Sequence, residues 1–179
     1  MKLIKHFITI TRHRHMVLRY CFKCGLYKQG LLHDLSKYGI IEFFNGVKYY
    51  TGIYSPHHNE RKNKGYSDAW MHHKGRNKHH SEYWYDVNPL TNRYEAVKMP
   101  DRYVGEMICD RIAASKNYNR KNYKNDIPLN YFLKEQDRII MHNDTRELVL
   151  KLLTMYQDKG EKYTFKYIKK NLRHNKATY

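Results

Sequence analysis

Apolar residues recur at helical spacing along almost the whole chain, and this pattern constrains the fold more than any other feature. Residues 2–24 carry one apolar stripe that stops at Gly25, and residues 40–50 carry a second stripe that stops at Gly52. No segment shows the strict alternation of apolar and polar residues that is typical of a half-buried strand. The sequence therefore predicts an all-α fold.

Proline, glycine and capping residues divide the rest of the chain into further helices and loops. The polar stretches 51–65 and 86–98 each contain a proline and are predicted as loops. Residues 144–147 resemble a capping box, and an apolar stripe follows them. The other predicted helical segments are a short piece after Gly30, residues 100–118, residues 128–141, the helix that begins at the capping box, and a last helix over 161–173.

The length and charge of the chain limit its organisation and its partners. A chain of 179 residues suits a single domain, here residues 1–179. Its 34 Lys and Arg against 17 Asp and Glu give a formal net charge of +17, which attracts polyanions or phosphorylated substrates. The basic residues are dispersed, so a merely basic surface is an equally good interpretation. Three cysteines, no signal peptide and no membrane-spanning stretch favour a cytoplasmic protein without a membrane partner.

A histidine and an aspartate stand side by side at His33-Asp34. The neighbouring Leu31, Leu32 and Leu35 argue against full exposure of this pair. Burial of an imidazole and a carboxylate is costly unless a partner binds them, and together they suit Mn, Fe, Ni, Co or Zn. A surface ion pair and a helix cap are the alternatives.

Two histidine doublets, His72-His73 and His79-His80, lie seven residues apart. On a continuous helix this spacing is two turns, whereas a break at Gly75 would let both doublets fold toward one centre. Binding a metal in the neutral form would remove the repulsion between protonated histidines. A solvated basic loop and a phosphate-binding patch are the alternatives.

Two further candidates lie on predicted helices. Asp110 shares a helical face with Tyr103 and Met107, so its carboxylate is expected to point inward, toward an arginine or a metal ion. His13 and His15 lie on the first helix, where their spacing lets only one of them point inward.

This order of side chains resembles the HD-domain superfamily of metal-dependent phosphohydrolases: a helical histidine, a His-Asp pair, further histidines and a late helical aspartate. The motifs HDLSK (33–37), EFF (42–44), HHKGRNKHH (72–80) and EMICD (106–110) are similar to those of an uncharacterised HD-like family of bacteria and phages, which carries only a domain-of-unknown-function label. The resemblance covers about residues 13–155. It implies a single HD-like helical bundle with a metal site between helices.

The resemblance also implies a ligand set for one or two divalent transition metal ions. It favours His13 over His15, because His13 has the family's spacing to Gly25 and to the His-Asp pair. The histidine-rich middle of the chain favours two ions. The implied ligands are His13, His33, Asp34 and Asp110 for the first ion and His73 and His80 for its extension, with His72 and His79 as alternatives.

The implied activity is hydrolysis of a phosphate ester or phosphodiester, with a nucleotide as the favoured substrate, by metal-activated water. Asp34 would bridge two ions or orient the water. Glu42 is a candidate general acid or base, and its alternative is a solvent-facing helix charge. Basic side chains near the pair and in the histidine segment are expected to contact the phosphate: Lys37, Lys74, Arg76 and Lys78.

Three other functions fit the same residues. Some HD relatives are oxygenases, so a di-iron oxygenase is one of them. A basic nucleic-acid-binding protein with structural histidines is the second. A non-catalytic metal protein that senses a nucleotide is the third.

Overall fold

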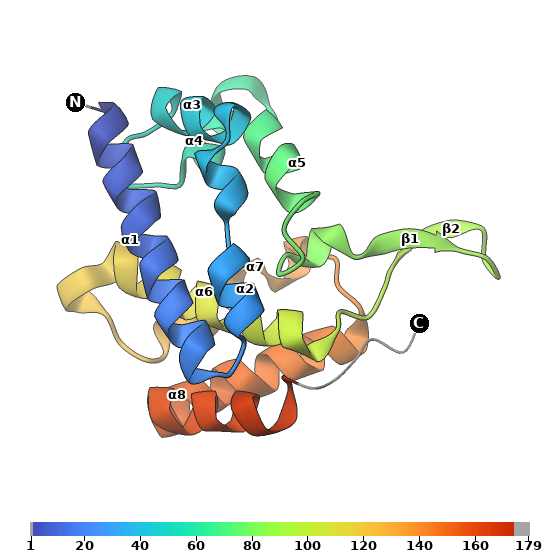
Figure 1. Ribbon diagram of the computed structural model, residues 1–179. Helices are drawn as coiled ribbons and strands as arrows, with labels where there is room; N and C mark the ends of the chain where they lie inside the picture. Colours follow the sequence, from blue (N-terminus) through green and yellow to red (C-terminus); the bar gives the residue numbers. More distant parts are fainter. Residues whose placement is uncertain (1, 174–179) are drawn as a thin grey trace.

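The long first helix, α1 (Lys2–Lys23), connects the two ends of the molecule (Figure 1). One end is formed by α3 (Ile40–Lys48) and α4 (Pro56–Lys64), and the other by α8 (Asn143–Asn171). The computed structural model describes residues 2–173. Within that range no helix is both long and apolar enough to cross a membrane.

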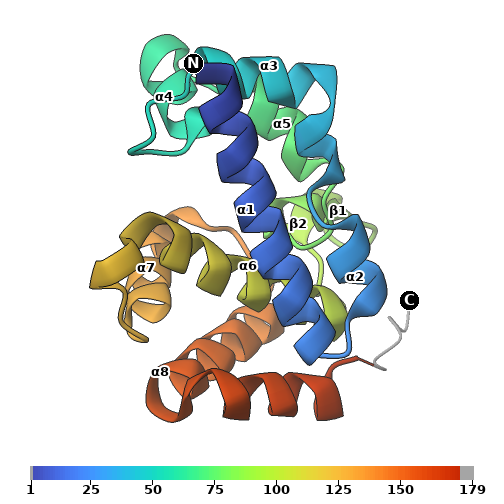
Figure 2. The same cartoon turned by 60° about the vertical axis from the view of Figure 1, so that its left-hand side comes forward.

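Three helices enclose most of the core. Helices α1, α6 (Asp101–Asn119) and α8 contact one another, and α7 (Ile127–Glu135) closes the side between α6 and α8 (Figure 2). The other helices are α2 (Tyr27–Leu32), packed against α1, and α5 (Asp68–Lys74), packed against α3. The side chains that fill the core are apolar and fully buried, and they include Val17, Ile108, Ile112, Phe132 and Leu152. The mainly helical class predicted from the sequence is therefore confirmed.

Helix α8 is interrupted at Gly160, where the backbone takes φ 71° and ψ −176°. This conformation is essentially restricted to glycine, so the residue type at this position permits the break. The segment after the break turns back along the molecule and buries Phe165 and Ile168 in the same core. It lies where the sequence predicts a separate last helix.

The prediction of no strands is wrong. The stretch predicted as a loop over 86–98 forms an antiparallel hairpin, β1 (Tyr85–Asn88) and β2 (Arg93–Ala96), in which Val87 pairs with Tyr94. Asn92, at the turn, has a positive φ of 52°, which asparagine tolerates better than most residues. Both strands project from the helices and remain largely exposed, so they carry no buried face that could produce an alternating pattern.

The predicted loop over 51–65 is also wrong, because it contains α4. The Ser55 hydroxyl accepts a hydrogen bond from the His58 backbone N–H (3.3 Å), Pro56 occupies the first turn, and Gly65 ends the helix with φ 85°. These are ordinary helix boundaries, but α4 has no apolar stripe.

Two helix ends differ from the predicted ones. Helix α8 is capped by His142, whose Nδ1 accepts from the Asp144 N–H (3.2 Å), while the Thr145 hydroxyl accepts from the Met99 N–H (3.0 Å). The predicted capping box at 144–147 is therefore not formed. Helix α7 ends at Glu135, before the predicted end at residue 141.

Candidate metal centre

The pair His33-Asp34 lies at a break between helices. Helix α2 ends at Leu32, and a 3₁₀ turn begins at Leu35, so the predicted helical piece around the pair is wrong. Asp34 takes a left-handed conformation (φ 53°, ψ 25°), which a non-glycine residue holds only when its surroundings impose it. Arg14 of α1 donates to the carbonyl oxygens of Leu31 (2.6 Å) and His33 (3.1 Å) and so fixes this turn.

The turn directs His33 and Asp34 toward two helices. His13 of α1 and Asp110 of α6 meet there, with 2.9 Å between His13 Nε2 and Asp110 Oδ1. His33 Nε2 lies 3.3 Å from Asp34 Oδ2 and 3.7 Å from Asp110 Oδ1. One donor atom from each of these residues lies within 4.8 Å of all the others. We call His13, His33, Asp34 and Asp110 the first donor group.

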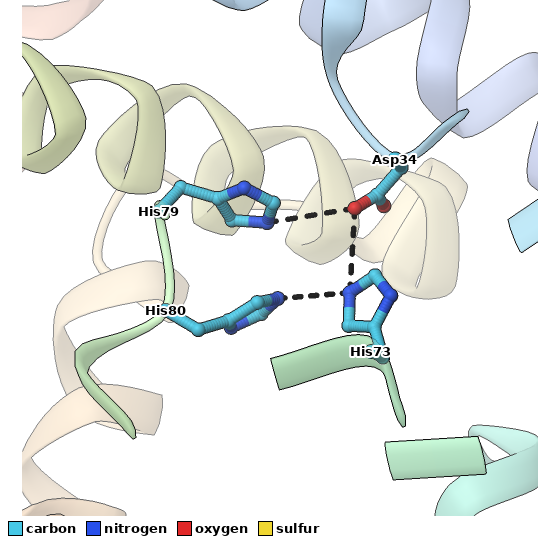
Figure 3. Close-up of side chains that lie close together, drawn as sticks. All are labelled: Asp34, His73, His79 and His80. Carbon is cyan, nitrogen blue, oxygen red and sulfur yellow. Dashed lines mark hydrogen bonds and ion pairs between the residues drawn. The ribbon is translucent and has the colours of Figure 1, made fainter. Parts of the chain in front are cut away.

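A second donor group surrounds the other oxygen of Asp34 (Figure 3). Asp34 Oδ1 lies 3.3 Å from His73 Nε2 and 3.5 Å from His79 Nε2, and His73 Nε2 lies 3.0 Å from His80 Nε2. Helix α5 supplies His73, and the segment after α5 supplies the other two histidines. The second donor group is thus Asp34, His73, His79 and His80, which meet the same 4.8 Å criterion.

The structure distinguishes the members of each histidine doublet. His73 joins the centre, whereas His72 turns its Nδ1 to Glu42 Oε1 (2.7 Å). Both His79 and His80 reach the centre, although the sequence left His79 as an alternative only. On α1, His13 is buried and His15 is exposed.

Glu106 is a buried carboxylate that the sequence did not single out. One of its oxygens, Oε1, accepts from His33 Nδ1 (2.9 Å) and from His79 Nδ1 (3.2 Å). These bonds place an N–H of each ring on Nδ1 and turn both Nε2 atoms toward Asp34. Its position four residues before Asp110, on the same face of α6, is the sequence signal that could have revealed it.

Glu42 of α3 performs the same task for the second donor group. It is 3% exposed, so the alternative of a solvent-facing charge is wrong. Its oxygens accept from His72 Nδ1 and His73 Nδ1, each at 2.7 Å. Because both oxygens are engaged by histidines, the geometry favours a role in orienting His73 over one as general acid or base.

Several buried polar atoms at the centre lack a hydrogen-bond partner. They are both oxygens of Asp34, His33 Nε2 and His79 Nε2, all at the surface of a donor group, although Asp34 Oδ2 forms an ion pair with Lys37. Leaving such atoms unpaired costs about 1–3 kcal/mol each. Cations bound at the two donor groups would contact all four atoms, so these residues fit metal ions.

The charges at the centre also fit a cation. Burial by itself raises the pKa of Asp34, but His33 and Lys37 hold it well below its usual range. Burial likewise opposes the charge of Asp110, yet His13 holds its pKa well below the usual range. Burial lowers the pKa of His33, but Asp34 and Glu106 raise it well above its usual value. Both aspartates are therefore ionised at neutral pH, and they attract positive charge.

A cavity of about 270 Å³ opens beside the donor atoms. His13, His73, His80 and Asp110 form part of its wall, and so does Lys37. The Lys37 ammonium lies 2.6 Å from Asp34 Oδ2. Burial opposes its charge, but Asp34 and Asp110 raise the pKa of Lys37 above its usual value.

The structure does not bring the other predicted phosphate contacts to this cavity. Lys74, Arg76 and Lys78 are absent from its wall. Arg76 donates to the His72 carbonyl of the preceding turn (3.1 Å), and Lys78 lies over the ring of Tyr83 (5.5 Å). Of the four basic residues proposed from the sequence, Lys37 is the one placed to contact a substrate.

Comparison with known proteins identifies a family but no described relative. A search of curated proteins and a search of solved structures each found no match. A family model described as "Family of unknown function (DUF5662)" matches residues 2–155, a range that holds every residue of both donor groups. The chain therefore belongs to the DUF5662 family.

Proposed function

We propose that this protein is a metal-dependent phosphohydrolase that acts on a phosphate ester or phosphodiester, with a nucleotide as the favoured substrate. The observation that carries the proposal is the position of Asp34, whose two oxygens face different donor groups beside a cavity that also contains Lys37. A divalent ion bound there would acidify a water molecule and polarise a phosphoryl oxygen. The resemblance to the HD-domain superfamily supports the same assignment.

Some residues of the centre would bind the metal ions, and others orient the histidine rings. The first donor group would hold one ion and the second donor group another, with Asp34 common to both. Glu106 and Glu42 fix the orientation of the histidine rings through their Nδ1 atoms. Imidazole and carboxylate ligands together suit Mn, Fe, Ni, Co or Zn.

Lys37 is the residue that would bind the phosphate. Its ammonium contacts Asp34 Oδ2 and also lines the cavity, so a phosphoryl oxygen beside the donor atoms would lie within its reach. An ammonium group stabilises such an oxygen as a point charge.

A di-iron oxygenase is the second candidate, because a carboxylate shared between two histidine-rich groups also suits a pair of iron ions. The two functions differ in what they consume. An oxygenase would contain iron and would stop turning over when oxygen is removed. A phosphohydrolase would release phosphate at the same rate with and without oxygen.

The decisive experiment measures metal content and then phosphate release. The purified protein is analysed for bound metals and assayed on nucleotides and phosphodiesters with Mn, Ni, Co, Fe and Zn. We expect stoichiometric metal and a metal-dependent release that Asp34→Asn reduces by more than about 100-fold, because ligand loss exceeds the effect of losing an orienting partner. Asp158→Asn, on the exposed surface of α8, is the matched control.

Two results would overturn the proposal. One is protein without stoichiometric transition metal after growth in medium that supplies all five metals. The other is an Asp34→Asn variant that keeps the metal content and turnover of the control.

A further inference from the structure

The cavity extends from the metal centre along one face of α1. His6, Ile10 and His13 all line it, and they lie at intervals of four and three residues. His6 and His13 are thus two helical turns apart, which is about 10 Å along the axis. Helix α6 lines the cavity in the same way, with Ala114 and Tyr118 after Asp110. The cavity therefore has a metal end and a second end, which we call the distal end.

His6 at the distal end is a buried imidazole with an unused polar atom. It is 5% exposed, and its Nδ1 has no hydrogen-bond partner. A Cβ at position 46 would collide with the His6 ring, so the absence of a side chain at Gly46 of α3 makes room for this histidine. The fold thus accommodates a histidine at a buried place where none of its described neighbours binds Nδ1.

The other polar groups of the distal end are neutral hydroxyls and amides. The Tyr50 hydroxyl lies 3.0 Å from the Thr9 hydroxyl, and the Tyr50 ring meets the His6 ring edge to face at 5.6 Å. Burial and the charge of Lys37 lower the pKa of His6 to about 4, so its ring is neutral at physiological pH. Asn117 completes the polar part of this wall.

Formal charge is confined to the metal end. Among the described residues that line the cavity, the Lys, Arg, Asp and Glu side chains are Lys37, Glu42 and Asp110, and each of them belongs to or contacts the metal centre. An anionic group at the distal end would have Lys37 as its nearest lysine among the lining residues, and that ammonium is already paired with Asp34. Burying an unpaired charge is far more costly than burying a hydrogen-bonded neutral group.

We propose that the distal end binds the part of the substrate that bears the phosphate, as an uncharged planar group that hydrogen-bonds to His6 and lies against the ring of Tyr50. This inference rests on the proposed function, because the phosphate itself is assigned to the metal end. It restricts the substrate to monophosphates of uncharged planar or heterocyclic alcohols. Diphosphates, triphosphates and polynucleotides would place a second anion in a cavity whose single lysine, Lys37, is already assigned to the first phosphate.

The test measures ligand binding at the distal end independently of phosphate hydrolysis. Binding of non-hydrolysable phosphonate analogues of the nucleoside monophosphates is measured by calorimetry on metal-loaded protein, with methylphosphonate and the corresponding diphosphate analogues for comparison. We expect at least one monophosphate analogue to bind about tenfold or more tightly than either comparison ligand. Equal affinity for the monophosphate analogues and methylphosphonate, or tighter binding of a diphosphate analogue, would overturn the inference.

Two substitutions assign the selectivity to residues. His6→Phe removes both ring nitrogens, and Tyr50→Leu removes the aromatic ring at a half-buried position where the fold should tolerate the change. Each should weaken binding of the selected analogue by about tenfold and leave methylphosphonate unchanged. His15→Phe, on the exposed face of the same helix, should bind both ligands as the unaltered protein does. Unchanged selectivity in both cavity variants would contradict the inference.

Failure of this inference can be told apart from failure of the proposed function. Free nucleosides, which carry no phosphate, are titrated into the same variants. Nucleoside binding that His6→Phe weakens, in a protein that hydrolyses no phosphate ester, would reject the phosphohydrolase but keep the distal site. If the protein releases phosphate but His6→Phe and His15→Phe bind the analogues equally well, the phosphohydrolase is kept and the distal site is rejected.

Discussion

One oxygen of Glu106 orients two histidines that serve different donor groups. Glu106→Gln keeps the size of the side chain but removes its charge and places an amide N–H₂ beside the histidine N–H groups. We expect metal affinity to fall by about 10–100-fold, the usual effect of losing an orienting partner. Competition with a chromophoric chelator measures the metal affinity of the variant and of the unaltered protein.

Glu147→Gln provides the comparison, because Glu147 is exposed on α8. Its metal affinity should equal that of the unaltered protein. If Glu106→Gln also retained full affinity, the hydrogen bonds from His33 and His79 would have no bearing on metal binding, and the assignment of Glu106 would fail.

At the scale of single residues, the sequence could indicate the ligands but not what orients them. His33-Asp34 and the histidine doublets stand out because polar residues of ligand type occur beside apolar ones. Glu106 does not stand out, since its role depends on the His33 and His79 rings, which reach it from distant parts of the chain. The left-handed backbone of Asp34 was equally hidden, because it depends on the contacts that Arg14 makes with the turn.

At the scale of elements, the orientation of α1 decides which of its two nearby histidines reaches the centre. His13 faces Asp110, and His15 is exposed on the other side of the helix. His13→Gln should therefore lower the bound metal to well below one equivalent, while His15→Gln leaves it unchanged. Elemental analysis of both variants, purified in parallel, gives the comparison, and equal loss in the two would contradict this orientation of α1.

Helix α4 is held by a buried carboxylate, and this gives the fold a dependence on pH. Glu60 is fully buried and accepts hydrogen bonds from Ser67 Oγ (2.6 Å) and Asn45 Nδ2 (2.9 Å). Although burial opposes its charge, these bonds, together with those from the Lys64 ammonium and the Asp68 N–H, lower the pKa of Glu60 to about 2. Because the folded-state pKa lies below the unfolded value of about 4.3, Glu60 stabilises the fold above that pH and the contribution is lost as the pH falls toward 2.

Urea unfolding at several pH values tests this dependence. We expect Glu60→Gln to lower the free energy of unfolding at pH 7 by up to about 3 kcal/mol, with the difference from the unaltered protein shrinking between about pH 4.3 and pH 2. A difference that stays constant over this range would show that Glu60 stabilises α4 by packing and not by its charge.

The same carboxylate explains why α4 could not be predicted. Helices are recognised in a sequence mainly by an apolar stripe, and the buried side of α4 presents Glu60 in place of such a stripe. The boundary residues Ser55, Pro56 and Gly65 were visible in the sequence, but without a stripe they suited a loop as well. The helices with apolar stripes, such as α1 and α6, were found close to their observed bounds.

At the scale of the whole molecule, helical spacing could predict the class of the fold but not its arrangement. The spacing shows which face of each helix is buried, and it contains no information on which buried faces meet. The meeting of α1, α6 and the turn at Asp34 places residues 13, 34 and 110 together, although they are far apart in the chain. A cavity that follows both α1 and α6 results from that crossing, so it could not be inferred from any single segment.

The net charge of +17 gives the last prediction, which concerns the molecule as a whole. A positive field draws anionic substrates toward the protein, and salt weakens it by shortening the screening length from about 30 Å at 0.01 M to about 8 Å at 0.15 M. We therefore expect kcat/KM for a nucleoside monophosphate to fall several-fold over this range of salt concentration, while kcat stays nearly constant. Once the substrate lies at the metal end, its contacts are shielded from the solvent and salt has little effect on them.

The nucleic-acid-binding alternative predicts a different response to the same titration. Its affinity for a polynucleotide would fall by orders of magnitude with salt, because each neutralised phosphate releases counterions, and it would be unaffected by removal of the metal. Filter binding of a labelled oligonucleotide before and after treatment with a chelator distinguishes the two. We expect binding of the oligonucleotide to be weak in both states, since the charge of this chain is dispersed and its buried cavity has a single lysine, Lys37, among the described residues of its wall. Tight binding that survives the chelator, in a protein without turnover, would instead make the surface charge the functional feature of the molecule.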